Sequence, residues 1–305
     1  MDSDRSACPT PVLFLIHRRP ELAVQVLGAI RQARPARLLV AADGPEGDLR
    51  CQETRRLVLQ GIDWPCSVLT HFSQAQLGCR KAVSQALDWG FGLHEKLIVI
   101  EDDCLPDVSF FQFCTELLER YEGRPEVMQI SGCNETGHEP SDGYSYFASR
   151  FPSIWGWASW RRAWQHHDPY LQAWPALRQT TTWSKTCRFR GEAAWRTSLY
   201  DAGCAGDVDA WSFAWNFAQH ARGALSLIPS RNLVANLGWG ADALHTRDVS
   251  DPRARMTTGE MKFPLQHPDV LKADGRADLG YFNKYCRPPS LLKRVSRKLR
   301  RILKS

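Results

Sequence analysis

Three consecutive acids, Glu101, Asp102 and Asp103, directly follow the apolar run LIVI at residues 97–100. A short, wholly apolar run of this kind predicts a buried central strand. The acids then fall at its carboxyl end, where open α/β sheets place their ligands. Adjacent carboxylates near a core repel one another unless a cation offsets their charge. Mg²⁺ or Mn²⁺ would supply that charge and bridge to phosphate, and the alternative is a solvated acidic turn.

Further polar residues stand at the ends of other predicted elements. They are His17 and Arg18 after the run at 12–16, Asp43 after the run at 38–42, and Arg80 and Lys81 at the start of a helix expected over 78–93. Parallel strands end at one edge of a sheet, so these side chains should gather around the acids. An acid at the second strand suits a base or ribose, and cations at a helix start suit phosphate. The set predicts a nucleoside-diphosphate site.

The elements that must position these residues alternate along the first 130 or so residues. Strand and helix patterns follow one another four times, which predicts an α/β fold with a mostly parallel sheet flanked by helices. The polar break at 132–143 marks a change in composition. We therefore expect a nucleotide-binding half at 1–143, a second half at 144–250, an irregular extension at 251–286 and a basic tail at 287–305.

The second half is rich in aromatic residues. Nine of the twelve tryptophans lie between Trp155 and Trp215. Tryptophan mostly serves packing, but its ring can also stack on the apolar face of a sugar while its N–H bonds to hydroxyls. Both interpretations stay open for different members of the group.

Composition sets broader limits. An apolar share of 43% allows a sizeable core, and no stretch approaches the roughly 18 apolar residues of a spanning helix. The first residues lack the basic region and the apolar region that a secretory signal would have. The ten cysteines form no CxxC pair. We therefore expect reduced thiols and a cytoplasmic protein.

The net charge of +6 comes from the tail. Residues 287–305 hold eight Lys and Arg and no acid, so subtracting eight from six leaves −2 for the rest. Leu292, Val295, Leu299 and Ile302 fall on one face of a possible basic amphipathic helix. Such a helix suits an anionic membrane surface, so we expect a peripheral association with the inner face of the membrane. The alternative is a solvated tail, and nucleic acid is not an expected partner.

Seven blocks in order carry a resemblance to a known family. They are PVLFLIHRRPE (11–21), AADGP (41–45), LGCRKAVSQALDW (77–89), IEDDCLPDVSFFQFC (100–114), ISGCN (130–134), WGWASWRRAW (155–164) and NLGWGADALHT (236–246). Together they resemble the GT-A (Rossmann-like) glycosyltransferases, in particular bacterial members of glycosyltransferase family 2, with a likeness to the N-acetylglucosaminyltransferase I type. The resemblance spans roughly residues 11 to 246.

The resemblance implies a metal-dependent transferase that uses a nucleotide sugar, most often a UDP-sugar, and inverts the anomeric carbon. It implies a glycan or glycolipid acceptor and a role in bacterial surface polysaccharide synthesis. The implied roles are Asp103 as metal ligand, His245 near the diphosphate or metal, Glu101 and Asp102 facing the ribose or donor sugar, Asp43 on the base or ribose, and Arg80 and Lys81 on the phosphate side.

The acceptor hydroxyl needs a general base on the face opposite the leaving group. Similar proteins often carry an acid just after the tryptophan at the start of a helix, where this chain has Ser212. Asp209 is the preferred base, with Asp207, Glu135 and Asp242 as alternatives. If none serves, the enzyme would act slowly or be degenerate. Ser212 also motivates an alternative, a non-catalytic binder of nucleotide sugars or glycans on the same scaffold. A sugar-phosphate nucleotidyltransferase is disfavoured because residues 17–20, HRRP, lack glycines.

Overall fold

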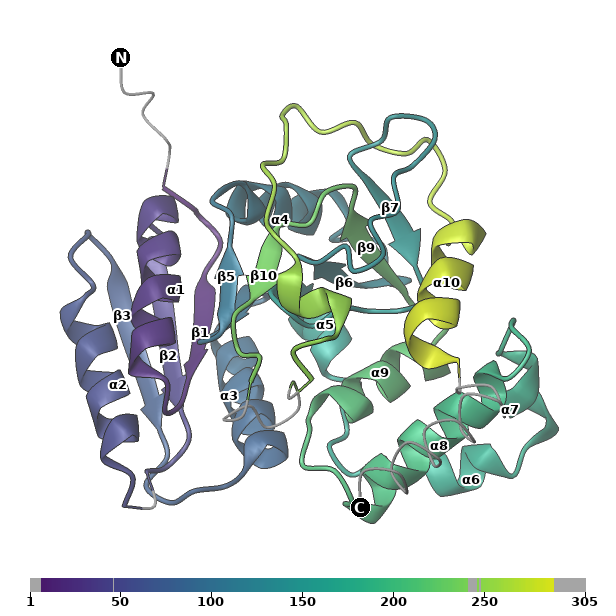
Figure 1. Ribbon diagram of the computed structural model, residues 1–305, viewed down its shortest axis with the longest axis horizontal. Coiled ribbons are helices and arrows are strands. Elements are labelled where there is room, and N and C mark those ends of the chain that lie inside the picture. The colour runs from purple at the N-terminus through teal and green to yellow at the C-terminus, as the bar shows by residue number, and fades with distance from the viewer. Residues whose placement is uncertain (1–6, 46, 241–245, 247, 288–305) are drawn as a thin grey trace, which may run out of the picture.

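The computed structural model describes residues 7–45, 47–240, 246 and 248–287. Figure 1 shows an α/β fold in which one large sheet is covered by helices. The strands are β1 Val12–Ile16, β2 Arg37–Ala42, β3 Ser67–Phe72, β4 Lys96–Glu101, β5 Cys104–Pro106, β6 Val127–Ser131, β7 Tyr146–Ser149, β8 Trp157–Trp160, β9 Leu225–Pro229 and β10 Val234–Asn236. The helices are α1 Pro20–Ala33, α2 Leu49–Gln60, α3 Cys79–Leu93, α4 Ser109–Arg120, α5 Arg161–Trp164, α6 Trp174–Arg178, α7 Thr181–Lys185, α8 Glu192–Ala205, α9 Ser212–Ala221 and α10 Gly275–Tyr281.

The main sheet has the strand order β3-β2-β1-β4-β8-β6-β9-β7. Strand β8 runs antiparallel to β4 and β6, and β7 runs antiparallel to β9, whereas the other neighbouring pairs are parallel. The predicted fold class, an α/β protein with a mostly parallel sheet, is therefore confirmed. Strands β5 and β10 form a separate antiparallel pair.

Alternating residues of β1 show how the layers form. Val12, Phe14 and Ile16 face a core shared with α1 and α4, whereas Leu13 and Leu15 face a second core shared with α3, α5 and α9. Successive side chains of a strand point to opposite faces, so a wholly apolar strand requires cover on both sides. These two cores hold the ends of β1 and β4 in place.

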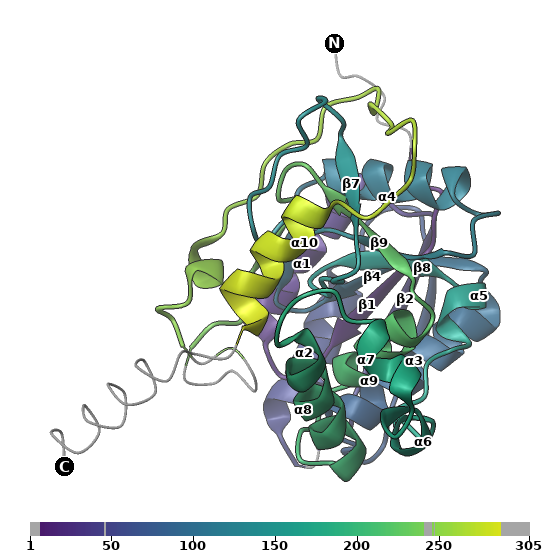
Figure 2. The same ribbon diagram turned by 90° about the vertical axis from the view of Figure 1, so that its right-hand side faces the viewer.

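Helices α6, α7 and α8 lie together on the side of the molecule opposite β1, β2 and β3 (Figure 1), and Figure 2 looks at the molecule from that side. Their small core is aromatic and includes Trp174, Trp183 and Tyr200. Many of the tryptophans therefore serve packing, as one of the two interpretations predicted. Trp157 of β8 and Trp215 of α9 are both fully buried and pack against each other in the core between α9 and the sheet.

The extension at 251–286 is less irregular than expected. It contains a 3₁₀ turn at Pro252–Arg255, helix α10 and a π-helical turn at Phe282–Cys286. The Asp274 side chain starts α10 by accepting hydrogen bonds from the backbone N–H groups of Arg276 and Ala277. The sequence reasoning missed this helix because it is only seven residues long.

Among the described residues, no helix combines the length and apolar character needed to cross a membrane. The predicted membrane-binding tail falls almost entirely on residues 288–305, which lie outside the described part of the chain. The proposed domain boundaries stay a prediction, and strands from both expected halves share the main sheet.

Candidate active site

A cavity of about 580 Å³ opens where the strand order reverses. In the sheet, β2 and β3 lie on one side of β1, and β4 lies on its other side. The switch point is therefore between β1 and β4. In open α/β sheets this is where ligands bind, beyond the carboxyl ends of the strands. The volume lies within the range of about 300–1,000 Å³ that is typical of small-molecule sites. We call this space the main cavity.

Most of the predicted site residues meet at the main cavity. Those that line it are His17, Arg18, Asp43, Glu101, Asp102, Asp103 and Asp209. The first six come from the ends of β1, β2 and β4, as the sequence predicted. Asp209 belongs to the opposite wall, which residues 208–213 form just before and at the start of α9.

Glu101, Asp102 and Asp103, which we call the acid cluster, occupy the end of β4 and the turn before β5. Asp102 and Asp103 are buried, with 7% and 9% of their surface exposed. The backbone N–H of His17 donates to Asp102 Oδ2 over 2.8 Å. The Arg19 guanidinium bonds to Asp103 Oδ2 and lies 3.7 Å from Asp102 Oδ1. Arg19 is thus the counter-ion of the cluster.

Three ionised acids would carry more negative charge than Arg19 offsets, so the metal-free cluster retains protons. Burial, followed by repulsion from Asp103 and Asp102, raises the pKa of Glu101 to about 8. Burial and Asp103 raise the pKa of Asp102 to about 7. Burial alone would lower the pKa of Arg19, but Asp103 and Asp102 raise it. A site in which acids hold on to their protons this strongly is suited to a further cation.

The strand pair β5–β10 closes the site over Asp103. The backbone N–H of Leu237 donates to the Asp103 carbonyl over 2.7 Å. A Cβ atom at Gly238 would lie 2.0 Å from Asp103 Oδ2 and 2.8 Å from Arg19 Nη1. Only glycine allows the backbone to pass this close to the pair.

Asp43 holds the loop that leads into α3. Its Oδ1 accepts hydrogen bonds from the N–H groups of Gly44 and Leu77, each over 2.8 Å, and its Oδ2 accepts one from Gly78 over 3.0 Å. The predicted contact of Asp43 with a base or ribose has the right location, because Asp43 lines the main cavity. Its main observed role is to fix the start of α3.

The first turn of α3 differs from the expectation. Asp209 Oδ2 accepts from Cys79 N–H over 2.7 Å, and Asp209 Oδ1 accepts from Arg80 N–H over 2.9 Å. Gly78, at φ +83°, brings this carboxylate close, since a Cβ there would lie 2.6 Å from Asp209 Oδ2. A carboxylate of the protein itself therefore occupies the anion site of this helix start.

Arg80 and Lys81 do not meet the acids as predicted. Arg80 Nη1 donates to the Gly203 carbonyl over 3.1 Å, and Lys81 is exposed. Neither is among the described residues that line the main cavity. The sequence pattern placed them in the correct helix turn, but the bond to Gly203 turns Arg80 toward α8.

The other candidate bases lie elsewhere. Asp207 is exposed and borders a shallow depression beside α8. Glu135 is buried, and its Oε2 lies 3.3 Å from Arg253 Nη1, away from the main cavity. Asp242 and His245 lie outside the described residues.

A pair of tryptophans in contact lies at the edge of the site. Trp155 lines the main cavity, and its ring meets that of Trp239 edge to face with centroids 5.8 Å apart. The Arg253 guanidinium lies 5.7 Å and 5.8 Å from the two ring centroids. Trp155 therefore fits the predicted sugar-stacking role better than the buried core tryptophans do.

Sequence reasoning did not select Arg19, Gly238 or Arg253 as site residues. Arg19 had a local signal, because it follows β1 together with His17 and Arg18. Gly238 lies in the glycine-containing block at 236–246, but its neighbours Asp103 and Arg19 are more than 100 residues away in the chain. Arg253 follows its partner Asp251 by two residues, but its partner Glu135 is 118 residues away.

The donor chemistry of the cluster fits a divalent cation. Carboxylate oxygens are preferred ligands of Mg²⁺ and Mn²⁺, and the surplus of negative charge favours a doubly charged ion. Within the described residues, no group of three or more His, Cys, Asp or Glu side chains is arranged to hold a metal. Asp103 and Asp102 would therefore supply one or two oxygens and a phosphate ligand the others, as is usual for Mg²⁺.

Comparisons with known proteins give a limited result. No model of a protein family and no curated protein matches the chain. Solved structures with a likeness include a UDP-glucose pyrophosphorylase complexed with UDP-glucose (14% identity, 46% of this chain and 62% of that chain, TM-score 0.29). Another is mouse xyloside xylosyltransferase 1 in its apo form (11% identity, 86% of this chain and 98% of that chain, TM-score 0.37).

A third likeness is to 4-diphosphocytidyl-2C-methyl-D-erythritol synthase from Anaerococcus prevotii (6% identity, 72% of this chain and 87% of that chain, TM-score 0.36). This chain spans less than two thirds of the pyrophosphorylase. Because all three TM-scores are below 0.5, the fold class rests on the sheet topology described above.

Proposed function

We propose that this protein is an inverting, metal-dependent glycosyltransferase that moves a sugar from a nucleoside-diphosphate donor, such as a UDP-sugar, to a glycan or glycolipid. The observation that carries the proposal is the acid cluster at the switch point, buried and only partly neutralised, beside a cavity of about 580 Å³. A bound Mn²⁺ or Mg²⁺ would stabilise the charge that develops on the leaving diphosphate.

Residues of the chain itself position the donor in this proposal. The nucleoside would lie at the ends of β2 and β3, where Asp43, His71 and Ser73 supply polar groups and Ala82 and Val83 of α3 supply an apolar wall. Asp103 and Asp102 would face the metal and diphosphate. Trp155 would stack on a sugar ring at the opposite end of the cavity.

Asp209 stays the preferred general base, because it lines the main cavity whereas Asp207 and Glu135 do not. Its two oxygens already accept helix N–H groups, but a carboxylate offers about four acceptor directions. Asp209→Ala should lose about 1 kcal/mol of unfolding free energy through the lost helix cap. It should also lower turnover by at least ~100-fold if Asp209 is the base. A variant that loses stability but keeps turnover would assign Asp209 to capping alone.

The direct test of the function is a donor screen. The purified chain is incubated with Mn²⁺, a panel of nucleotide sugars and candidate acceptors, and release of nucleoside diphosphate is measured. Wild type should turn over at least one donor, and Asp103→Ala should lose that turnover. The control is Asp63→Asn, which removes an exposed acid paired with Arg31 on the surface. No turnover by wild type, or full turnover by Asp103→Ala, would contradict the proposal.

A second candidate is a non-catalytic binder of nucleotide sugars or glycans. The capping role of Asp209, together with Ser212 at the usual acid position, favours it. Calorimetry separates the two candidates. Binding of a nucleotide sugar without release of nucleoside diphosphate, across all acceptors, would support the binder.

We also propose that the protein works in bacterial surface polysaccharide synthesis at the cytoplasmic face of the membrane. The basic, amphipathic sequence of the tail supports this location. Deleting residues 290–305 should move the protein from vesicles of anionic lipid to the soluble fraction. If the full-length protein does not bind such vesicles at low salt, the membrane proposal is contradicted.

A further inference from the structure

The Arg19 side chain connects the acid cluster to a second cavity. The residue lies just before α1, but its side chain makes no cap bond to that helix. The guanidinium instead reaches the acid cluster, and 24% of the side chain is exposed. It also borders an adjoining cavity of about 470 Å³, which Arg50 and Trp239 help to line. The side chain therefore has both a partner and space into which it can turn.

Arg19 bonds to one of the two oxygens through which Asp103 could bind a metal. Arg19 Nη1 bonds directly to Asp103 Oδ2, whereas Cys104 Sγ contacts Oδ1 over 3.4 Å. A divalent ion would sit about 2.0–2.6 Å from a carboxylate oxygen. The Gly238 backbone closes another approach to the same oxygen. With Arg19 on one side of Asp103 Oδ2 and the Gly238 backbone on another, a metal that binds this oxygen would have to displace the guanidinium.

We propose that Arg19 and a divalent cation compete for Asp103. Arg19 is the counter-ion of the acid cluster in the metal-free protein, and metal entry moves its guanidinium toward the adjoining cavity. The inference deepens the proposed function and rests on it for the identity of the metal site. It makes Arg19 a positioning residue that sets the metal affinity of the free protein.

The test measures Mn²⁺ binding to the full chain by calorimetry, without any nucleotide sugar. Arg19→Met keeps the length of the side chain and removes its charge and its donors. It should bind Mn²⁺ roughly 10-fold more tightly than wild type, in the range of ordinary coupling between two ligands. The matched control is Arg50→Met, which removes the same charge from the adjoining cavity, where Arg50 pairs with Glu21 over 2.8 Å. The control should leave the Mn²⁺ affinity within about twofold, since exposed charges interact weakly through water.

Two further measurements keep the test decisive. Asp103→Asn should remove the tight Mn²⁺ site, and adding Arg19→Met to it should give no gain, as a double-mutant cycle requires for direct competition. Mn²⁺ should also raise the melting temperature more in Arg19→Met than in wild type. If Arg19→Met does not fold, Arg19→Lys, which keeps the charge but loses the fork of donors, should still bind Mn²⁺ more tightly than wild type.

Three results would overturn the inference. They are unchanged or weaker Mn²⁺ binding in the Arg19 variant, equal tightening in Arg50→Met, and no Mn²⁺ binding in either the variant or wild type. Because the measurement involves no turnover, the inference can fail while the donor screen succeeds. Turnover without competition would leave the transferase proposal intact and make the Arg19–Asp103 pair a permanent part of the site.

Discussion

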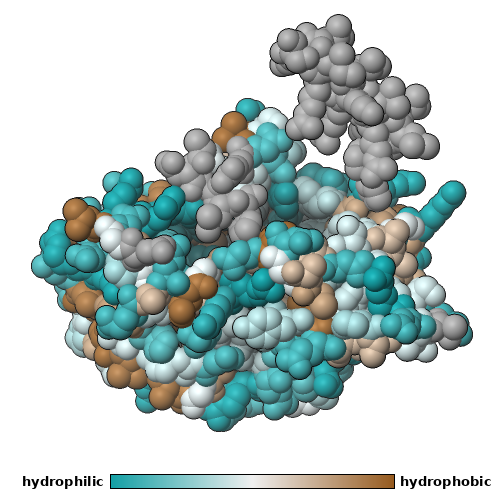
Figure 3. Space-filling view, turned by 90° about the horizontal axis from the view of Figure 1, so that it is seen from below, coloured by the Kyte–Doolittle hydropathy of each residue, from teal (hydrophilic) through white to brown (hydrophobic). Residues whose placement is uncertain are grey.

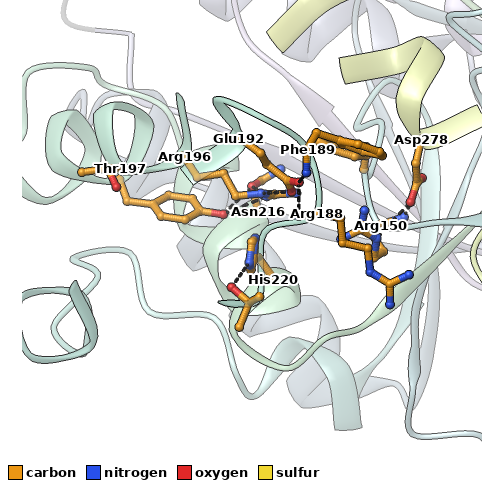
Figure 4. A network of polar contacts seen from close by, with 12 residues as sticks. Arg150, Arg188, Phe189, Glu192, Arg196, Thr197, Asn216, His220 and Asp278 are labelled. Atoms are coloured by element: carbon orange, nitrogen blue, oxygen red, sulfur yellow. Dashed lines mark hydrogen bonds and ion pairs between the residues drawn. The ribbon is translucent and has the colours of Figure 1, made fainter. Parts of the chain in front are cut away.

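Two groups of buried charges in the described part of the chain differ in their balance of positive and negative charge. One is the acid cluster with Arg19 at the main cavity. The other, which we call the helical network, joins α8 and α9 and is drawn in Figure 4. In the acid cluster three carboxyl groups face one guanidinium, whereas in the helical network each charged group has a matching partner.

The helical network is centred on Glu192 and Arg196, which are 0% and 1% exposed. Glu192 accepts hydrogen bonds from the N–H groups of Arg188 and Phe189 over 2.8 Å and 3.1 Å, and from Arg196 Nε over 2.9 Å. Arg196 Nη1 donates to the Tyr200 hydroxyl over 3.1 Å and to Asn216 Oδ1 over 3.0 Å. Both ions are thus paired and hydrogen-bonded, which is what burial of charge requires.

A neighbouring ion pair is also largely buried with its charges paired and hydrogen-bonded. Arg150 Nε lies 3.0 Å from Asp278 Oδ2, and Ser149 Oγ donates to Asp278 Oδ1 over 2.7 Å. This pair attaches α10 to β7. The comparison shows that buried charge alone does not mark an active site. A surplus of one sign beside a cavity makes a stronger candidate site, because unbalanced charge favours binding of an oppositely charged ligand.

The largest expected effect comes from breaking the balanced group. Arg196→Met should lower the unfolding free energy by about 3–5 kcal/mol, because it leaves the Glu192 carboxylate buried without its cation. Urea unfolding would measure the loss. Arg190→Met, at an exposed position near the same helix, should change the free energy by less than about 0.5 kcal/mol. A loss below 1 kcal/mol for Arg196→Met would show that the network contributes little to stability.

The next largest expected effect comes from Gly238, where the backbone passes close to the acid cluster. Gly238→Ala should cost about 1–3 kcal/mol, because its Cβ would collide with Asp103 and Arg19. It should also weaken Mn²⁺ binding by at least ~10-fold, which calorimetry would show. The control is Gly259→Ala, whose Cβ would have ordinary contacts with Arg231 at 3.9 Å. Normal Mn²⁺ affinity in Gly238→Ala would show that the backbone after β10 does not affect the metal site.

The two groups should respond to pH with opposite sign. His220 lies beside the helical network, and burial, together with the charges of Arg196 and Arg150, lowers its pKa to about 2. The unfolded chain therefore binds a proton below about pH 6.5 that the folded chain does not. Stability should fall as the pH drops from 6 to 4, by up to ~1.4 kcal/mol per pH unit. In His220→Gln the slope over this window should be smaller, and an unchanged slope would exclude His220 as its source.

The acid cluster should give the folded protein the opposite pH dependence of stability. Because the pKa of Glu101 is raised to about 8, the folded chain holds a proton that the unfolded chain has lost above about pH 4.5. Stability should therefore fall as the pH rises from 5 to 8, by up to ~1.4 kcal/mol per pH unit. Glu101→Gln should flatten this fall, measured by urea unfolding without metal. If Glu101→Gln were less stable than wild type at pH 8, Glu101 would not be repelled by the neighbouring acids as we propose.

The sequence predicted those parts of the site that depend on local pattern. The apolar runs of β1, β2 and β4 are continuous, so both the strands and the polar residues at their ends follow directly from the chain. The convergence of Asp43 with Asp103 follows from the general geometry of parallel sheets. These two predictions needed no knowledge of tertiary contacts.

The remaining features depend on contacts between distant residues, which periodicity does not encode. Asp209 caps α3 from 130 residues away, and this changed the expected roles of both Asp209 and Arg80. Strand β8 enters the sheet between β4 and β6, although it follows both in the chain. Helices α6 and α7 have five residues each, too few for a helical pattern to be recognised.

The central claim is that the acid cluster holds a metal–diphosphate group in the main cavity, and one measurement tests it directly. Calorimetry would compare UDP binding in the presence of Mn²⁺ for wild type, Asp103→Asn and the surface control Asp63→Asn. We expect wild type and Asp63→Asn to bind alike, and Asp103→Asn to bind at least ~10-fold more weakly. Equal affinity in all three proteins, or no binding by wild type, would contradict the account.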